Sequence, residues 1–315
     1  MSPRSTSADL DDLLLGDDDA PGGAGGPQDL PVRGPRRRTM TEGVAAGHEV
    51  LVNPGSTRVA RVAGLVRRTA RARHHRFLVE GPQGVREAVA YAPDRVLDLY
   101  MTERALERHP EIWVAAEEAG LYRHLTSERV MEAMSPDAQG VLAVAAMEEA
   151  TGSEALASAV KDARLVAVLV EIQDPGNAGT MIRVADAAGA DAVVLVRGCV
   201  EATSPKVVRS TAGSLFHLPV VTGVALDDTV SALRGAGLAV LAADRGGELD
   251  LFDATDLLSA PAAWVLGNEA QGLGPQVLEQ ADASVSVPVY GRAESLNVAA
   301  AAAVCLYASA QALRS

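Results

Sequence analysis

The feature that most constrains the fold is a series of short aliphatic runs in the C-terminal half, each followed directly by a loop rich in glycine and polar residues. Leu165 to Ile172 is aliphatic except for Glu171, which is typical of a strand buried on both faces of a parallel sheet. A second run, Ala262 to Leu266, ends in Gly-Asn-Glu. Helical segments separate such runs, so we predict an α/β fold with a parallel sheet. We expect its strands at 165–172, 192–196, 218–221, 238–242, 262–266 and 283–287, and helices at 180–188, 226–234 and 297–313.

The last segment is predicted to be an irregular loop followed by an alanine-rich helix. Pro288 and Gly291 break the strand pattern and force the loop. Ser295 and Asn297 stand at the start of the helix, where such side chains commonly cap free backbone N–H groups. Alanine lets the helix backbone approach a neighbour closely, either in a tight core or on a partner chain.

A smaller α/β unit is predicted before this domain. Its strands are expected from Phe77, at 95–100, at 121–125 and at 141–146, and its helices at 85–91, 105–119 and 128–134, with Ser127 as an N-cap. We divide the chain into a tail at 1–47, this unit at 48–147, a linker at 148–160 and the larger domain at 161–315.

Composition excludes several classes of protein. Cys199 and Cys305 lack metal-ligand spacing, which argues against a disulfide scaffold or a metal site. No stretch reaches the ~18 apolar residues of a membrane span, and the N-terminus lacks a signal-peptide pattern, so we expect a cytoplasmic protein. The tail is rich in Asp, Gly and Pro and is expected to be disordered.

Charge is distributed unevenly along the chain. The formal net charge is −13, yet residues 58–76 contain neither Asp nor Glu. The arginines of this basic segment are Arg58, Arg61, Arg67, Arg68, Arg71, Arg73 and Arg76. A basic stripe in an acidic protein is the pattern expected for binding a phosphate backbone, and the alternative is a solvated helix face. Lys206 and Arg209 are predicted to add phosphate contacts, with surface solvation as their alternative.

Three segments resemble, in order, the motifs of the SpoU (TrmH-like) RNA 2′-O-ribose methyltransferases of the SPOUT superfamily. They are Asn177-Ala-Gly179 followed by Arg183, Leu266-Gly-Asn-Glu269 with Gly272, and Val287-Pro288 leading to Ser295-Leu-Asn297. The match extends over about residues 165–313. The segment from Phe77 to Pro82, after the basic segment, also resembles the start of that family's substrate-binding domain.

The resemblance implies a specific architecture and cofactor. The family's C-terminal domain threads a deep trefoil knot, an exception to the rule that chains are unknotted. Loops of the knot bind S-adenosyl-L-methionine, and the active site is completed across a homodimer. The implied cofactor-binding residues are Leu266, Gly267, Asn268, Val287, Pro288 and Leu296. The implied catalytic residues are Asn177, Arg183, Glu269, Ser295 and Asn297.

The chemistry limits what Arg183 can do. Methyl transfer from a sulfonium to a ribose hydroxyl is an in-line displacement, so the enzyme must align the reacting atoms and help the hydroxyl lose its proton. A guanidinium keeps its proton above pH ~12. We therefore predict that Arg183 binds the adjacent phosphate and stabilises the developing alkoxide. Asn177 and Asn297 are expected to orient loops or the ribose, and Glu269 to hold Arg183.

The predicted function is therefore S-adenosyl-L-methionine-dependent 2′-O-methylation of RNA. The separate N-terminal unit resembles those of ribosomal RNA enzymes, which favours 23S ribosomal RNA as the substrate. The alternatives are a transfer RNA 2′-O-methyltransferase and a non-catalytic RNA-binding protein of the same fold. A small-molecule methyltransferase would leave the basic segment without a role.

Overall fold

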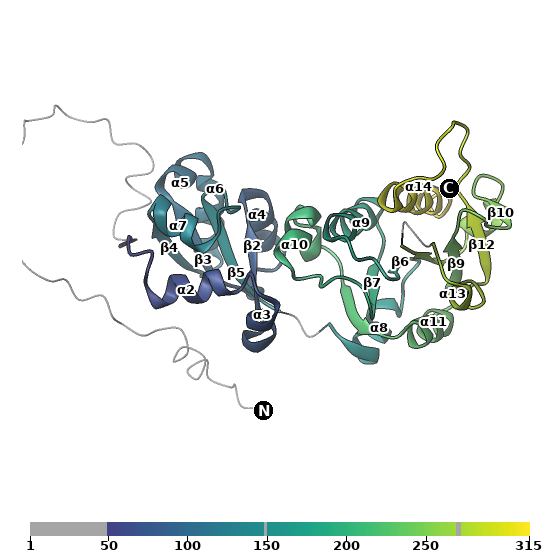
Figure 1. Ribbon diagram of the computed structural model, residues 1–315, viewed down its shortest axis with the longest axis horizontal. Helices are drawn as coiled ribbons and strands as arrows, with labels where there is room; N and C mark the ends of the chain where they lie inside the picture. Colours follow the sequence, from purple (N-terminus) through teal and green to yellow (C-terminus); the bar gives the residue numbers. More distant parts are fainter. Residues whose placement is uncertain (1–48, 148–149, 269–271) are drawn as a thin grey trace, which may run out of the picture.

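The computed structural model of the protein describes residues 49–147, 150–268 and 272–315 (Figure 1). These residues form two α/β domains that lie side by side, each built on its own sheet. The predicted tail at 1–47 and Glu269 lie outside the described residues. Within the described ranges, no helix has both the length and the apolar character needed to span a membrane.

The smaller domain has a five-stranded sheet in the order β1-β4-β3-β5-β2. Its strands are β1 (Val50–Leu51), β2 (Arg76–Glu80), β3 (Val96–Thr102), β4 (Tyr122–Thr126) and β5 (Val141–Ala146). Its helices are α2 (Thr57–Gly64), α3 (Arg68–His74), α4 (Pro82–Tyr91), α5 (Glu103–Arg108), α6 (Pro110–Glu118) and α7 (Glu128–Met134), with a short η3 turn (Pro93–Arg95). Helices α2 and α7 pack over one face of the sheet, and α4 and α6 pack over the other.

Two segments of the smaller domain each form two helices. The helix expected at 105–119 separates into α5 and α6 because the backbone of His109 is not helical, and Pro110, which lacks a backbone N–H, starts a new helix after it. The basic segment forms α2 and α3, joined by a short turn. The Ser56 hydroxyl caps α2 by accepting a hydrogen bond from the Val59 N–H.

The larger domain has a seven-stranded sheet in the order β10-β12-β9-β11-β6-β7-β8. Its strands are β6 (Leu165–Leu169), β7 (Ala192–Val196), β8 (Val220–Val224), β9 (Ala239–Ala243), β10 (Leu249–Asp250), β11 (Ala262–Leu266) and β12 (Ala283–Ser286). Its helices are α8 (Gly152–Val160), α9 (Pro175–Ala188), α10 (Pro205–Thr211), α11 (Leu226–Gly235), α12 (Thr255–Leu258), α13 (Pro275–Leu278) and α14 (Val298–Ala312), with an η4 turn (Ser214–Phe216). Every strand pair in this sheet is parallel, which confirms the predicted fold class.

Most of the predicted linker is an integral part of the larger domain. Residues 152–160 form α8, and its Leu156 and Val160 are buried against Val166 and Val168 of β6. The helix therefore covers one face of the larger sheet, rather than connecting the two domains loosely.

Helix α9 begins five residues earlier than the sequence suggested. Asp174 accepts a hydrogen bond from the Asn177 N–H at 2.8 Å, and Pro175 occupies the first helical position. Asn177 therefore lies in the first turn of α9, whereas we expected a loop there.

The two domains share part of one hydrophobic core. Val208, Leu215 and Phe216 belong to the larger domain but are buried among core residues of the smaller one. The ring of Phe216 stacks on Phe77 of β2 with 6.4 Å between the ring centroids. This apolar contact fixes the smaller domain against α10 and η4 of the larger domain.

Helices α9 and α10 approach so closely that one position requires glycine. A Cβ atom at Gly179 would lie 2.5 Å from the Ser210 Cβ atom and 2.6 Å from the Val207 carbonyl oxygen. Real side chains do not tolerate such contacts, so a larger residue would push the two helices apart.

We expect Gly179→Ala to lower the free energy of unfolding by about 1–3 kcal/mol, because the added methyl group overpacks the α9–α10 contact. Urea denaturation followed by circular dichroism would measure the change. Gly235→Ala at the end of α11 is the matched control, since a Cβ atom there meets nothing within 4 Å. Equal stability of the two variants would contradict the prediction.

Candidate cofactor cavity and nucleic-acid interface

A cavity of about 480 Å³ opens at the carboxyl ends of β9, β11 and β12. The carboxyl edge of a parallel sheet is where open α/β folds bind ligands. Five of the six predicted cofactor-binding residues line this cavity, together with the predicted catalytic Ser295. They are Leu266, Gly267, Asn268, Val287 and Leu296, and the sixth, Pro288, is not among the lining residues. Motif residues separated by some thirty positions in the sequence therefore meet around one cavity.

The loop after β11 folds back on itself at the cavity wall. The Gly272 N–H donates a hydrogen bond to the Asn268 carbonyl at 2.9 Å. A Cβ atom at Gly267 would lie 2.5 Å from the Leu273 Cδ2 atom and 2.8 Å from the Gly272 carbonyl oxygen. Gly267 is therefore required for the close approach of Leu273 and Gly272 to the end of β11.

Asn177 and Asn297 meet where the first turns of α9 and α14 come together. The Asn297 amide donates a hydrogen bond to the Asn177 side-chain oxygen at 3.2 Å. The Asn297 oxygen in turn caps α14 by accepting bonds from the Ala299 and Ala300 N–H groups at 2.9 and 3.3 Å. The Asn297 side chain thus joins the N-termini of two helices.

Arg183 stands apart from Asn177, the other predicted catalytic residue on α9. It stands on α9 about 9 Å along the helix axis from Asn177 and is exposed on the face that also exposes Thr180 and Ala187. Arg183 is not among the residues that line the cavity. Its side chain makes no hydrogen bond or ion pair with any described residue.

Sequence reasoning missed two charged residues of the cavity wall. Asp244 and Arg245 follow β9 and line the cavity beside Gly246. One Asp244 carboxylate oxygen accepts a hydrogen bond from the Gly246 N–H at 2.9 Å. Their position directly after a parallel strand was the available signal, because side chains there face the ligand-binding edge.

A left-handed residue at the end of β6 was also missed. Glu171 has φ of 55°, which is uncommon for a residue with a side chain. Its carbonyl accepts a hydrogen bond from the Asn268 amide at 3.3 Å. The bend redirects the chain from β6 towards α9 and connects the loop after β6 to the cavity wall.

One predicted RNA-binding arginine has a structural role instead. Arg71 is 3% exposed, and its guanidinium donates hydrogen bonds to both oxygens of Glu201, at 2.8 and 2.7 Å. It also donates to the carbonyls of Leu65 and Val66, at 3.0 and 2.7 Å. The prediction that Arg71 contacts RNA is therefore wrong, because the group is buried and its donors are occupied.

The other arginines of the basic segment stay accessible. Arg61, Arg67, Arg68 and Arg73 are exposed, and Arg58 and Arg76 are half-buried. The buried Arg71 holds α3 against the loop that follows β7. The exposed arginines around it are therefore held beside the larger domain.

Lys206 and Arg209 differ in their availability. Lys206 is exposed on α10, with its ammonium 3.7 Å from Asp174, and so lies next to the first turn of α9. The Asn177 N–H hydrogen-bonds the Asp174 carboxyl and holds its pKa below the usual value, with Lys206 adding to the effect. Arg209 is paired with Glu80 and Asp137 of the smaller domain, so its predicted phosphate contact is replaced by an ionic link between domains.

The chain matches known proteins in sequence. Residues 164–307 match the SpoU rRNA Methylase family. The chain is 37% identical over 241 residues to the 23S rRNA (guanosine(2553)-2'-O)-methyltransferase RlmP of Bacillus subtilis (strain 168), an alignment that covers 75% of this chain and 89% of that protein.

Solved structures match over most of the chain. A crystal structure of an RNA 2'-O ribose methyltransferase has a TM-score of 0.68 and 30% identity, and the match covers 84% of this chain and 99% of that one. The AdoMet-bound rRNA methyltransferase from Sinorhizobium meliloti has a TM-score of 0.71 and 25% identity, covering 84% of this chain and 97% of that one. The chain therefore belongs to the SpoU family of RNA methyltransferases.

Proposed function

We propose that this protein transfers a methyl group from S-adenosyl-L-methionine to a ribose 2′-hydroxyl of 23S ribosomal RNA. The observation that carries the proposal is the convergence of Leu266, Gly267, Val287, Ser295 and Leu296 on one cavity at the carboxyl edge of the sheet. The name of the Bacillus subtilis relative supports the 23S substrate. The AdoMet bound in the Sinorhizobium meliloti structure supports the cofactor.

The cavity fits this cofactor in size and chemistry. Its volume of about 480 Å³ falls within the range of small-molecule sites. Leu266, Val287 and Leu296 offer apolar walls for a planar base, and the backbone around Gly267 offers hydrogen-bonding groups at the point where a side chain would not fit. When bound, the cofactor supplies a sulfonium-activated methyl group. These residues would hold the adenosine part.

The polar residues around the cavity have distinct proposed roles. The Asn177–Asn297 pair keeps the N-termini of α9 and α14 at a fixed separation, so that the loop carrying Ser295 is held over the cavity. Ser295 is positioned to hydrogen-bond the substrate. Arg183 binds the phosphate beside the target ribose and stabilises the developing alkoxide, while Glu269 orients Arg183.

Arg183 is proposed to act in the cavity of a partner chain. It faces solvent on α9 and does not line the cavity of its own chain. The adjoining exposed surface of α9 and α14 carries small residues and Tyr307, whose hydroxyl donates a hydrogen bond to the Ala187 carbonyl at 3.2 Å. A homodimer packed through this surface would bring Arg183 to the partner's site. The trefoil knot and a cytoplasmic location stay predictions.

The exposed arginines of α2 and α3 and Lys206 form the proposed RNA-binding surface. Arg67, Arg68 and Arg73 lie on or next to the helix that Arg71 fixes to the larger domain. Cations on a rigid support neutralise phosphates at a defined distance from the site of methylation.

A methylation assay tests the function directly. The protein is incubated with labelled S-adenosyl-L-methionine and with ribosomal or transfer RNA from a strain that lacks this protein. We expect label on one 23S nucleotide, with the methyl group on its ribose. Label on transfer RNA alone would replace the proposed substrate. Cofactor binding without transfer to either RNA would identify a non-catalytic RNA-binding protein.

We expect Gly267→Ala to weaken S-adenosyl-L-methionine binding at least tenfold, because the new methyl group displaces Leu273 or the loop at Gly272 from the cavity wall. Isothermal titration calorimetry would measure the affinity. Gly291→Ala is the control, since a Cβ atom there meets nothing within 4 Å. Unchanged affinity in Gly267→Ala would place the cofactor elsewhere.

We expect Arg183→Ala to lower kcat by about 10²–10³-fold with cofactor affinity unchanged, because it removes a cation that stabilises the transition state. Co-expression with Gly267→Ala on a second affinity tag tests whether the site is shared. A mixed dimer would contain one intact site, made from the cavity of one chain and Arg183 of the other, so activity should return. Failure of the purified mixed dimer to regain activity would place Arg183 in its own chain's site.

A further inference from the structure

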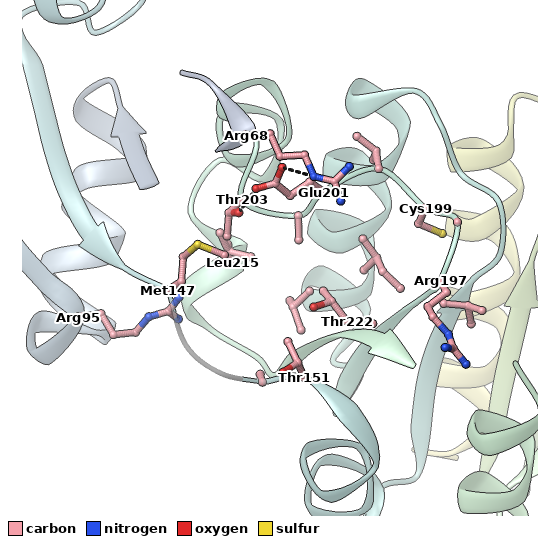
Figure 2. Close-up of a pocket in the computed structure, with 18 residues that line it drawn as sticks. Arg68, Arg95, Met147, Thr151, Arg197, Cys199, Glu201, Thr203, Leu215 and Thr222 are labelled. Carbon is pink, nitrogen blue, oxygen red and sulfur yellow. Dashed lines mark hydrogen bonds and ion pairs between the residues drawn. The ribbon is translucent and has the colours of Figure 1, made fainter. Parts of the chain in front are cut away.

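A second cavity, of about 310 Å³, lies between the two domains and has no role in the reaction proposed above. It is lined by the end of β7 and the loop that follows, by the edge strand β8, and by residues of the smaller domain. Figure 2 shows Arg68, Arg95 and Arg197 on three sides of it. We propose that this inter-domain cavity binds a nucleotide of the RNA substrate other than the methylated one, an inference that rests on the proposed function.

The inter-domain cavity lies on the same sheet edge as the cofactor cavity. It adjoins the carboxyl end of β7, two strands away from β11 in the sheet, a separation of about 10 Å. The Gln173 amide donates a hydrogen bond to the Gly198 carbonyl, which connects the loop after β6 to the loop after β7. One short stretch of RNA lying along this edge would reach both cavities.

The residues that line the inter-domain cavity carry a net positive charge, with Arg68, Arg95 and Arg197 against Glu201. The Arg197 side chain is exposed and makes no hydrogen bond or ion pair with any described residue. The Arg68 side chain is 85% exposed and lies 3.7 Å from Glu201. Both carboxylate oxygens of Glu201 already accept hydrogen bonds from Arg71. Two guanidinium groups are thus presented to solvent, and guanidinium groups bind phosphate through paired hydrogen bonds.

The interior of the inter-domain cavity suits a nucleoside. Leu215 and Met147 form an apolar part of the wall (Figure 2). Thr203 and Thr222 add hydroxyl groups that can hydrogen-bond a sugar or the edge of a base. The Arg95 guanidinium stacks over the Phe216 ring at 5.5 Å, which holds a planar cation at the side of the cavity. Proteins recognise unpaired RNA nucleotides with this combination of planar stacking groups, polar edges and cations.

An RNA segment fits the surroundings better than a free nucleotide does. Arg68 belongs to α3, so the cavity rim is continuous with the exposed arginines of the basic segment. A chain of phosphates would contact these arginines on leaving the cavity, whereas a mononucleotide would leave them unused.

Kinetics of the full-length protein with Arg197→Glu tests the inference. We expect the KM for ribosomal RNA to rise at least tenfold, with S-adenosyl-L-methionine affinity within twofold of wild type. With Arg197→Gln, which removes one cation, the slope of log affinity for RNA against log salt should become shallower by about 1. Arg104→Glu is the matched control, because Arg104 is exposed on α5 and does not line the cavity. Its KM should change less than twofold.

Equal KM values for Arg197→Glu and Arg104→Glu would overturn the inference, since the effect would then come from net charge alone. The alternative ligand for this cavity is a free nucleotide. Titration of adenosine and uridine monophosphates into wild type and Arg197→Glu tests this alternative. Tight binding of a monophosphate that Arg197→Glu abolishes, with RNA kinetics unchanged, would assign the cavity to a free nucleotide. If wild type methylates no RNA, the proposed function fails; if wild type is active and Arg197→Glu matches it, only this inference fails.

Discussion

The contact between the buried Arg71 and the half-buried Glu201 is the interaction on which the arrangement of the two domains depends. A buried ion pair is tolerated only when its polar atoms are satisfied, and Arg71 meets this condition through both Glu201 oxygens and the carbonyls of Leu65 and Val66. Removing Glu201 would leave the buried Arg71 charge without its partner, which is destabilising. The contact therefore fixes α3, with its exposed arginines, to the loop after β7 in a single orientation.

Further contacts between the two domains hold them together. The buried Glu80 of β2 binds Arg209 of α10. His217 lies 3.2 Å from Glu87 on α4 and 2.8 Å from Asp186 on α9, so it connects the smaller domain to the helix that carries Asn177. With Phe216 inserted into the smaller domain's core, these contacts join the domains at several separate points. RNA held by one domain would therefore meet the other at a constant distance, which alignment of the reacting atoms requires.

Local signals predicted most of the fold, and contacts distant in sequence account for what they missed. The strands at 141–146, 192–196 and 262–266 have the predicted bounds, because aliphatic runs flanked by turn residues carry that information themselves. Helix α9 starts before the predicted segment because the Asp174 cap and Pro175 begin it ahead of the amphipathic residues. For the site, the motif pattern located the cavity wall but not Asp244 or Arg245. Arg71 resembles its neighbours in sequence, and its paired hydrogen bonds to Glu201 join residues 130 positions apart.

The role proposed for Arg183 would explain how a site with so few titratable groups in its cavity carries out methyl transfer. An always-charged guanidinium cannot accept the proton of the ribose hydroxyl, so its contribution must be electrostatic and positional. Such a contribution requires that the guanidinium be held in a fixed position. The middle of α9 meets this requirement, because α9 packs against both α10 and α14. The alanine-rich surface of α14 beside it has little side-chain entropy to lose when another surface covers it. A second chain packed there would bury Arg183 beside a new cavity, where low dielectric strengthens its effect on developing charge.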